Sequence, residues 1–600
     1  MSALVLAGVI VTGAWTQLDE IGWAAWLALV LVFALDRYAA TTFRWRRLTL
    51  PPFAPLLLPL IACAAICALL LAHVAITARE EFGFSGDAGH HLSATRAFAL
   101  YFLRAGPFLV GTLAVFGALR FKRFRYAATV AMALLLVSSY LLPGSALFGR
   151  YPTGFYLLAT PMAVAFEAAN IPYPITANHI VNVVSVPIWL FVLRPLIIGR
   201  WPDWRVLPVA LLVYFQAPSF VYLGSTLLEP WAFVFLLLAV EALAAFEPDE
   251  RWMAVPLCAV ATFFKETAVL LLPAVWLLAC VEWRGFRPSI RKGGLTVGVA
   301  SVAPFLIYYA VRRGLQIERV YEIAGIAGTW TAARVSEWIA NVRAQVGVGG
   351  MLAIAAAMVW SLSSFSKATV DKRSIAWLAT AFVLALFFFA DVASIPYTGY
   401  GRFLAYSLIA LCGAVFAGAY RSAERDKALV ALCAVIAILQ LPAVTRMFAL
   451  DFQPDYERNS LEWNRGLIRL PVRTLAEKIA STPGGEQVRR IRVITFGTEL
   501  ISLRVAYPDL AERFDLEGDE QSAAAPDCRC RDNSEAVIAG FELPAHLGDT
   551  PAARAVFEQV SAACVNQIET TCLARTVEQH PSGAIVGAMG VGRVLLVAVP

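Results

Sequence analysis

The sequence predicts an all-α polytopic membrane protein with about 13–15 spanning helices, followed by a small α/β domain. Hydrophobic residues make up 59% of the chain and charged residues 15%, against about 45–50% and 25% in soluble proteins. The mean hydropathy of +0.67 excludes a disordered or collagen-like chain. The apolar composition ends near residue 447, so we expect a membrane domain over 1–447 and a soluble domain over 448–600.

Apolar runs define the spans, because a helix needs about 20 mostly apolar residues to cross a bilayer. The pair of runs near 253–283 is interrupted by Lys265 and Glu266. The candidate spans lie near 2–16, 22–39, 53–77, 99–119, 126–144, 178–197, 206–222, 229–246, 253–267, 268–283, 295–311, 348–364, 375–391, 403–420 and 428–447.

Loop charges orient these spans. Short basic loops lie at 44–47, 120–125, 194–205, 284–292, 367–373 and 421–427, whereas longer, less basic loops lie at 79–98, 145–177, 217–228, 312–347 and 392–402. Lys and Arg concentrate in cytoplasmic loops, so the first set is expected inside. This predicts a multi-pass protein of the cell (inner) membrane with a periplasmic C-terminal domain. These loops also account for the net charge of +6, and no nucleic acid partner is expected.

The C-terminal domain has the pattern of a small α/β fold. Strands are expected at 488–496 and 536–541, with a strand pair over 584–599, and helices at 470–481 and 551–566. Four of the ten cysteines lie in this domain, namely Cys528, Cys530, Cys564 and Cys572. An even number in one polar region favours disulfides and an oxidising compartment over free thiols. A zinc site is disfavoured because Cys-Arg-Cys has a single intervening residue.

The first long outer loop carries the densest group of reactive side chains. Glu80, Glu81, Asp87, His90 and His91 fall within a dozen residues directly after a span. A carboxylate here could act as a general base toward an acceptor, and the histidines could bind a phosphate or a metal ion. The same loop could instead be only a polar cap beside the lipid.

A second outer segment begins at Tyr151 and continues into an apolar stretch over 152–168. A full span here would reverse every later loop and bring the basic loop at 194–205 outside. We therefore expect a helix lying in or dipping into the outer interface, where tyrosines are common. An ordinary short span is the alternative.

Ionisable residues also occur inside or beside the spans. Glu229 opens one span, Lys265 and Glu266 interrupt another, and Asp391 and Arg402 flank a short outer loop that contains Tyr400. Charges are costly in a membrane, so a functional site is the default hypothesis. Local pairing of Lys265 with Glu266 or Glu229 is the structural alternative. All of these groups are expected toward the outer face.

The chain resembles the membrane glycosyltransferases of the GT-C fold. The resemblance covers roughly residues 50–420 and rests on the acidic loop, the Tyr-Pro segment, Leu-Glu-Pro, Phe-Lys-Glu-Thr and Tyr-Gly-Arg-Phe, in that order. Relatives of this kind include protein O-mannosyltransferases, lipid A aminoarabinose transferases and mycobacterial arabinosyltransferases. The resemblance implies an inverting hexosyl- or pentosyltransferase. It would move a sugar from a polyprenyl phosphate donor to a lipid, glycan or protein acceptor.

The resemblance also implies roles for individual residues. The catalytic aspartate of the family falls on Asp87, with Glu81 as the second candidate, although here Asp87 is followed by Ala88 rather than by another acidic residue. The metal requirement therefore stays open, and a divalent cation is the only cofactor considered. The residues expected to bind substrate are His90, His91, Tyr151, Glu229, Lys265, Glu266, Tyr400 and Arg402.

Two other functions remain open. A transporter or lipid flippase would show inverted repeats and charges near the membrane midplane, and no strong repeat is visible. A surface-polysaccharide ligase or polymerase uses similar lipid-linked donors and would concentrate basic residues in a late outer loop. The loop at 312–347, which contains five arginines, keeps that alternative open.

Overall fold

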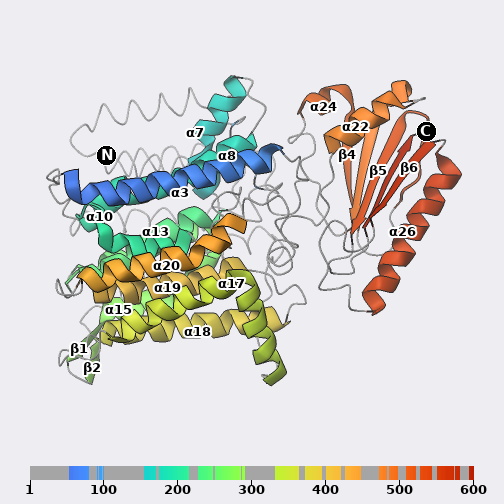
Figure 1. Ribbon diagram of the computed structural model, residues 1–600. Coiled ribbons are helices and arrows are strands. Elements are labelled where there is room, and N and C mark those ends of the chain that lie inside the picture. The colour runs from blue at the N-terminus through green and yellow to red at the C-terminus, as the bar shows by residue number, and fades with distance from the viewer. Residues whose placement is uncertain are drawn as a thin grey trace, which may run out of the picture.

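The computed structural model has a helical part and an α/β part (Figure 1). It describes residues 53–79, 91, 94–96, 99, 154–169, 174–214, 228–247, 250–284, 287–290, 332–363, 372–394, 401–420, 426–446, 472–482, 485–496, 508–521, 527–542, 551–572, 574–580 and 593–599. The predicted spans at 2–16, 22–39, 126–144 and 295–311 lie outside these residues, and so does nearly all of 99–119.

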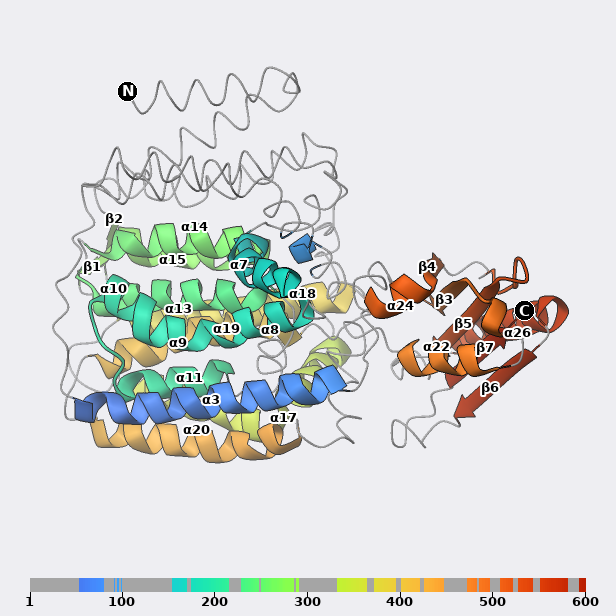
Figure 2. The same cartoon turned by 90° about the horizontal axis from the view of Figure 1, so that it is seen from above.

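The elements of the helical part are α3 (Phe53–Arg79), α7 (Gly154–Ala168), α8 (Pro174–Val183), α9 (Ser185–Ile188), the π-helix η1 (Trp189–Leu193), α10 (Arg194–Ile198), η2 (Trp204–Val206), α11 (Leu207–Tyr214), α13 (Glu229–Ala245), η3 (Arg251–Met253), α14 (Ala254–Phe264), η4 (Glu266–Leu271), α15 (Leu272–Cys280), β1 (Val281–Arg284), β2 (Arg287–Ile290), α17 (Ala332–Ser363), α18 (Lys372–Ser394), α19 (Gly401–Ala419) and α20 (Asp426–Arg446). Most of the longer helices of the helical part, such as α3, α13, α19 and α20, lie roughly side by side in both views, whereas α7 is inclined to them (Figures 1 and 2).

Helix α13 lies at the centre of this part, and nearly all of its residues are buried. It packs against α14 on one side and α19 on another, and α19 in turn packs against α18. Small residues allow close approach at two of these contacts. A Cβ added at Gly413 of α19 would lie 2.5 Å from the ring of Trp377 in α18, and one added at Gly349 of α17 would overlap the carbonyl oxygen of Leu439 in α20. Such small residues are common where membrane helices pack.

Two stretches in the described residues are long and apolar enough to cross a membrane, Phe53–Ala72 and Ala177–Ile198. Five shorter apolar helices lie at Trp204–Tyr214, Glu266–Cys280, Gly347–Ser363, Ser374–Ala385 and Ala405–Ala419. These stretches overlap the expected spans. The mainly helical character of the first part is therefore confirmed, while the number of spans stays a prediction.

Three expected boundaries were wrong. The span expected at 268–283 ends at Cys280, because residues 281–290 form the antiparallel hairpin β1–β2. The outer loop expected over 312–347 is helical from Ala332, since α17 begins there and kinks at Gly347, whose φ of 69° favours glycine. Arg194, expected in a basic loop, lies in α10 and is fully buried.

The α/β part contains a five-stranded mixed sheet with the order β4-β3-β5-β7-β6. Strand β3 is parallel to β4 and β5, whereas β7 is antiparallel to β5 and β6. Helices α22 and α26 lie on opposite sides of this sheet (Figure 1). The elements are α22 (Val472–Ser481), η8 (Gly485–Gln487), β3 (Arg490–Phe496), α24 (Pro508–Arg513), β4 (Asp515–Gln521), β5 (Glu535–Glu542), α26 (Pro551–Thr571), β6 (Ala574–His580) and β7 (Arg593–Val599).

Two disulfides connect α26 and the residue after it to the segment before β5. They join Cys528 to Cys564 and Cys530 to Cys572. The even number of cysteines predicted disulfides but not this pairing. The same segment is held by Arg492 of β3, whose buried guanidinium donates to Glu535 Oε1 at 2.9 Å and to the carbonyl oxygens of Asp527 and Arg529. The disulfides are consistent with an oxidising compartment.

Candidate functional site

The charged residues predicted inside spans meet where α13 begins and α14 ends. Helix α14 stops at Phe264 because Lys265 has an extended backbone (φ −149°, ψ 122°), and Glu266 then opens η4. Lys265 Nζ lies 3.7 Å from Glu229 Oε1 and 3.6 Å from Glu266 Oε1. The three side chains are 0%, 1% and 10% exposed. Both local ion pairs considered from the sequence are therefore present.

This charged cluster, formed by Glu229, Lys265 and Glu266, combines two carboxyl groups with one ammonium group. With all three ionised its net charge is −1. The N–O distances exceed the range of about 2.7–3.2 Å for a direct hydrogen bond, so both contacts are ion pairs rather than short hydrogen bonds. A phosphate would nevertheless be repelled by the two carboxylates unless a further cation accompanied it.

Helix α19 contributes to the same region through Tyr406. Its hydroxyl forms a hydrogen bond with the hydroxyl of Thr267, the residue that follows Glu266 in η4. Arg402 lies four residues earlier, in the first turn of α19, so its backbone is about one helical turn from that of Tyr406. The side chain of Arg402 lies outside the described residues.

A buried histidine lies close to this region. His91 is 1% exposed, and its Nδ1 lies 2.8 Å from the hydroxyl oxygen of Tyr156 in α7. The carbonyl oxygen of Tyr156 accepts a hydrogen bond from Thr160 at 2.6 Å, one turn later. The helix expected at 152–168 therefore supplies a polar partner to the loop that contains the reactive side chains.

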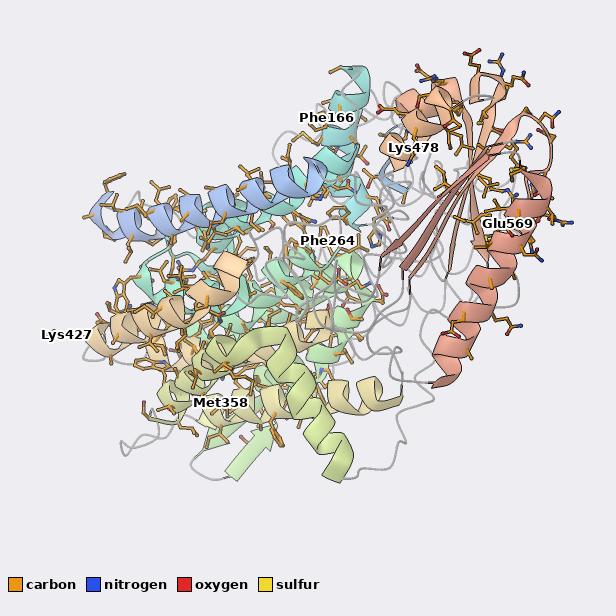
Figure 3. All side chains as sticks on the ribbon, turned by 45° about the vertical axis from the view of Figure 1, so that its right-hand side comes forward. Phe166, Phe264, Met358, Lys427, Lys478 and Glu569 are labelled. Carbon is orange, nitrogen blue, oxygen red and sulfur yellow. A yellow bond between two sulfur atoms is a disulfide. The ribbon has the colours of Figure 1, made fainter. Side chains whose placement is uncertain are left out.

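One apolar cluster connects these elements. Its buried members include Ala94, Tyr156, Val181, Trp231 and Phe264, which belong to the 91–99 segment, α7, α8, α13 and α14. Figure 3 shows Phe264 among the helices of the first part. Trp231 lies two residues after Glu229, and Phe264 precedes Lys265. The structure thus brings Glu229, Lys265 and Glu266 together at the start of α13. Tyr156, the hydrogen-bond partner of His91, belongs to the adjoining apolar cluster.

Several predicted site residues lie outside the described residues. They are Glu80, Glu81, Asp87, His90, Tyr151 and Tyr400, and the side chain of Asp391 is likewise not described. Among the residues that the structure does describe, no group of three or more His, Cys, Asp or Glu could hold a metal ion. The roles of Asp87 and Glu81 therefore stay predictions.

A second buried ion pair, further along α13, was not predicted from the sequence. Arg194 of α10 donates from Nε to Glu241 Oε1 at 2.9 Å and from Nη2 to the hydroxyl of Tyr420 at 2.8 Å. Both members of the ion pair are fully buried. Glu241 lies twelve residues after Glu229, or about 18 Å along the helix. Glu241 inside an apolar run could have indicated a buried ion pair. Arg194 was not considered as its partner, because Arg194 was expected in a loop.

Comparisons with known proteins add no assignment: no family model, curated protein or solved structure matches the chain.

Proposed function

We propose that the chain is an integral membrane glycosyltransferase that moves a sugar from a polyprenyl phosphate donor to an acceptor on the outer face of the membrane. The observation that carries the proposal is the charged cluster at the start of α13, which shares its apolar surroundings with the His91–Tyr156 pair. Buried ionisable groups in a membrane helix bundle are costly, and they commonly mark functional sites.

A membrane environment is supported by the outward faces of four helices. Large apolar side chains there are exposed, which would be unfavourable in water but is expected against lipid. Met358 illustrates this on α17 (Figure 3). The most exposed examples are Phe53 of α3, Val359 of α17, Phe382 of α18 and Ile438 of α20. The disulfides of the α/β part are consistent with an extracytoplasmic location for that part.

The proposed chemistry needs one base and one phosphate site. Asp87 takes the proton of the acceptor hydroxyl or amine, the acceptor attacks the anomeric carbon, and the bond from that carbon to the phosphate oxygen breaks. Polyprenyl phosphate leaves with the bonding electrons, so a single displacement inverts the anomeric centre. No strong general acid is required, because a phosphate leaves readily.

Arg402 is the cation that we assign to the donor phosphate. It lies in the first turn of α19, whose Tyr406 contacts η4, and a guanidinium can bind a phosphate through two hydrogen bonds. Lys265 is the second candidate. Its ammonium group already offsets part of the charge of two carboxylates, so we expect a smaller contribution to donor binding from Lys265 than from Arg402.

A transport function is less well supported. Many transporters are built from inverted repeats, and no strong internal repeat is visible in the sequence.

The test is transfer of a radiolabelled sugar from a panel of polyprenyl phosphate hexoses and pentoses, with the full chain in lipid. We expect Asp87→Asn to reduce turnover by about 10²–10⁴-fold, the usual contribution of general base catalysis, while donor binding persists. Glu80→Gln and Glu81→Gln are the matched controls and should have smaller effects. If Asp87→Asn keeps wild-type turnover and Glu81→Gln loses it, the general base would be Glu81 rather than Asp87. No transfer from any donor by the wild type would contradict the proposal.

A further inference from the structure

One side of the helical path from α8 to η1 carries four buried side chains with polar groups. They are Asn178, Asn182, Ser185 and Trp189, and each is 0% exposed. Their spacings of four, three and four residues put them on the same side of a helix. The surrounding stretch, Ala177–Ile198, is otherwise apolar enough to span a membrane. We call these four residues the polar track.

Three members of the polar track have buried polar atoms that make no hydrogen bond in the structure. Within the described part of the chain these atoms are Nδ2 and Oδ1 of Asn178, Oγ of Ser185 and Nε1 of Trp189. A buried polar group without a partner is destabilising, and in native proteins such groups are few. Three of them on one side of one helical path therefore require an explanation.

The backbone of the same path is also irregular. Val184 forms a turn between α8 and α9, and the next segment, Trp189–Leu193, is a π-helix. Short π-helical segments inside α-helices are rare and are frequently found at functional sites. The irregular backbone and the polar track coincide over residues 184–189.

The end of the polar track that contains Asn178 and Asn182 lies beside the candidate site. The indole Nε1 of Trp231 donates to the carbonyl oxygen of Val181 at 3.1 Å, and Trp231 is two residues from Glu229. Val181, Trp231 and Tyr156 belong to one apolar cluster. Asn178 and Asn182 are within one helical turn of Val181.

The side chains of the polar track fit a neutral, hydroxyl-rich ligand. A primary amide both donates and accepts, a serine hydroxyl does the same, and an indole N–H donates. None of these groups carries a charge, whereas a phosphate is usually met by cations. Amides and hydroxyls beside an aromatic ring are suited to the hydroxyl groups of a sugar.

We infer that the polar track binds the sugar hydroxyl groups of the donor, and that α8 and α9 shift to expose it when the sugar enters. The sugar is assigned to a lipid-linked donor only through the proposed function, on which this part of the inference rests. In the structure the polar track is buried, and the unpartnered polar atoms of Asn178, Ser185 and Trp189 lower stability. Binding supplies hydrogen bonds to those members of the polar track that the sugar contacts.

The first experiment measures thermal unfolding of the ligand-free full chain in lipid nanodiscs. Asn178→Leu and Ser185→Ala remove unpaired polar atoms at nearly constant shape, so each should raise the unfolding midpoint by about 1–3 °C. Ser361→Ala is the matched control, because the equally buried Ser361 hydroxyl donates to the carbonyl oxygen of Ala357 at 2.8 Å. Its midpoint should stay unchanged or fall. Lower midpoints in both polar-track variants would overturn the inference, since the groups would then be satisfied.

The second experiment uses soluble probes, a panel of octyl hexosides and pentosides below their micelle concentration, with octanol for comparison. At least one glycoside should stabilise the wild type more than octanol does. Asn178→Leu and Ser185→Ala should weaken its binding about tenfold, and Ser361→Ala should not. Equal effects of glycosides and octanol on the wild type would overturn the inference. If a glycoside binds but no sugar is transferred from any lipid donor, the inference that the polar track binds a sugar would stand. Only the proposed function would be contradicted.

Discussion

Replacing Lys265 by methionine separates ion pairing from donor binding at the start of α13. Methionine keeps much of the length of the side chain but removes the charge, so Glu229 and Glu266 lose their shared counter-ion. The variant Lys265→Met/Glu229→Gln/Glu266→Gln removes all three charges and serves as the comparison. Lys478→Met is the matched control, because Lys478 is exposed on α22 (Figure 3).

The expected magnitude follows from the distances and the burial. At 3.6–3.7 Å and an effective dielectric constant of about 20, each attraction is about 4 kcal/mol before desolvation is considered. Removing one partner of a buried ion pair typically costs about 3–5 kcal/mol, because the remaining charge stays buried. We therefore expect Lys265→Met to lower the free energy of unfolding by about 3–5 kcal/mol. The triple variant should recover most of this loss, and Lys478→Met should change it by less than about 0.5 kcal/mol.

The assay is equilibrium unfolding of the full chain in detergent, combined with binding of a polyprenyl phosphate probe. A large loss of stability in Lys265→Met, restored in the triple variant, would support pairing within the charged cluster. Wild-type stability in Lys265→Met together with lost probe binding would refute this reasoning. Lys265 would then bind the phosphate and would not be required as the counter-ion of Glu229 and Glu266.

Two further outcomes concern the α/β part. A membrane-impermeant thiol reagent should label no cysteine of this part in intact cells until a reductant is added, and labelling of all four without reductant would contradict the disulfides between Cys528 and Cys564 and between Cys530 and Cys572. Arg529 donates a hydrogen bond to Asp527 and so holds the pKa of that carboxyl below its ordinary value. This stabilisation is present above the unfolded carboxyl pKa of about 4 and is lost as the pH falls through the folded value. Arg529→Gln should therefore show a smaller loss of thermal stability below about pH 4, and an unchanged pH dependence would count against the contact.

The apolar helices within the described residues could be predicted approximately, because apolar composition indicates where such helices lie. The break at Lys265 was also foreseeable, since two charges interrupt an apolar run. Strand β4 was not, because its sequence DLEGDEQ has few strand-favouring residues. Parallel backbone pairing with β3 holds it in the sheet, and such tertiary contacts override local propensity.

The site was only partly predictable for a related reason. The charged residues could be named from their apolar neighbours, but their partners come from distant segments. His91 meets Tyr156, and Thr267 meets Tyr406, 139 residues later. Four cysteines allow three pairings, and the pairing observed depends on how α26 packs against the sheet. The residues of the polar track lie at helical spacing inside a predicted span, but they were not singled out from the sequence. The buried polar atoms of Asn178, Ser185 and Trp189 that make no hydrogen bond could be recognised only in three dimensions.

The most direct test of the proposed function is an experimental structure of the full chain in lipid with a bound polyprenyl phosphate sugar. We predict phosphate density beside the first turn of α19, near Arg402, and sugar density between the charged cluster and the polar track. The same donor bound near Arg194 and Glu241, or only on the lipid-facing sides of α3 and α20, would contradict sugar transfer at the start of α13.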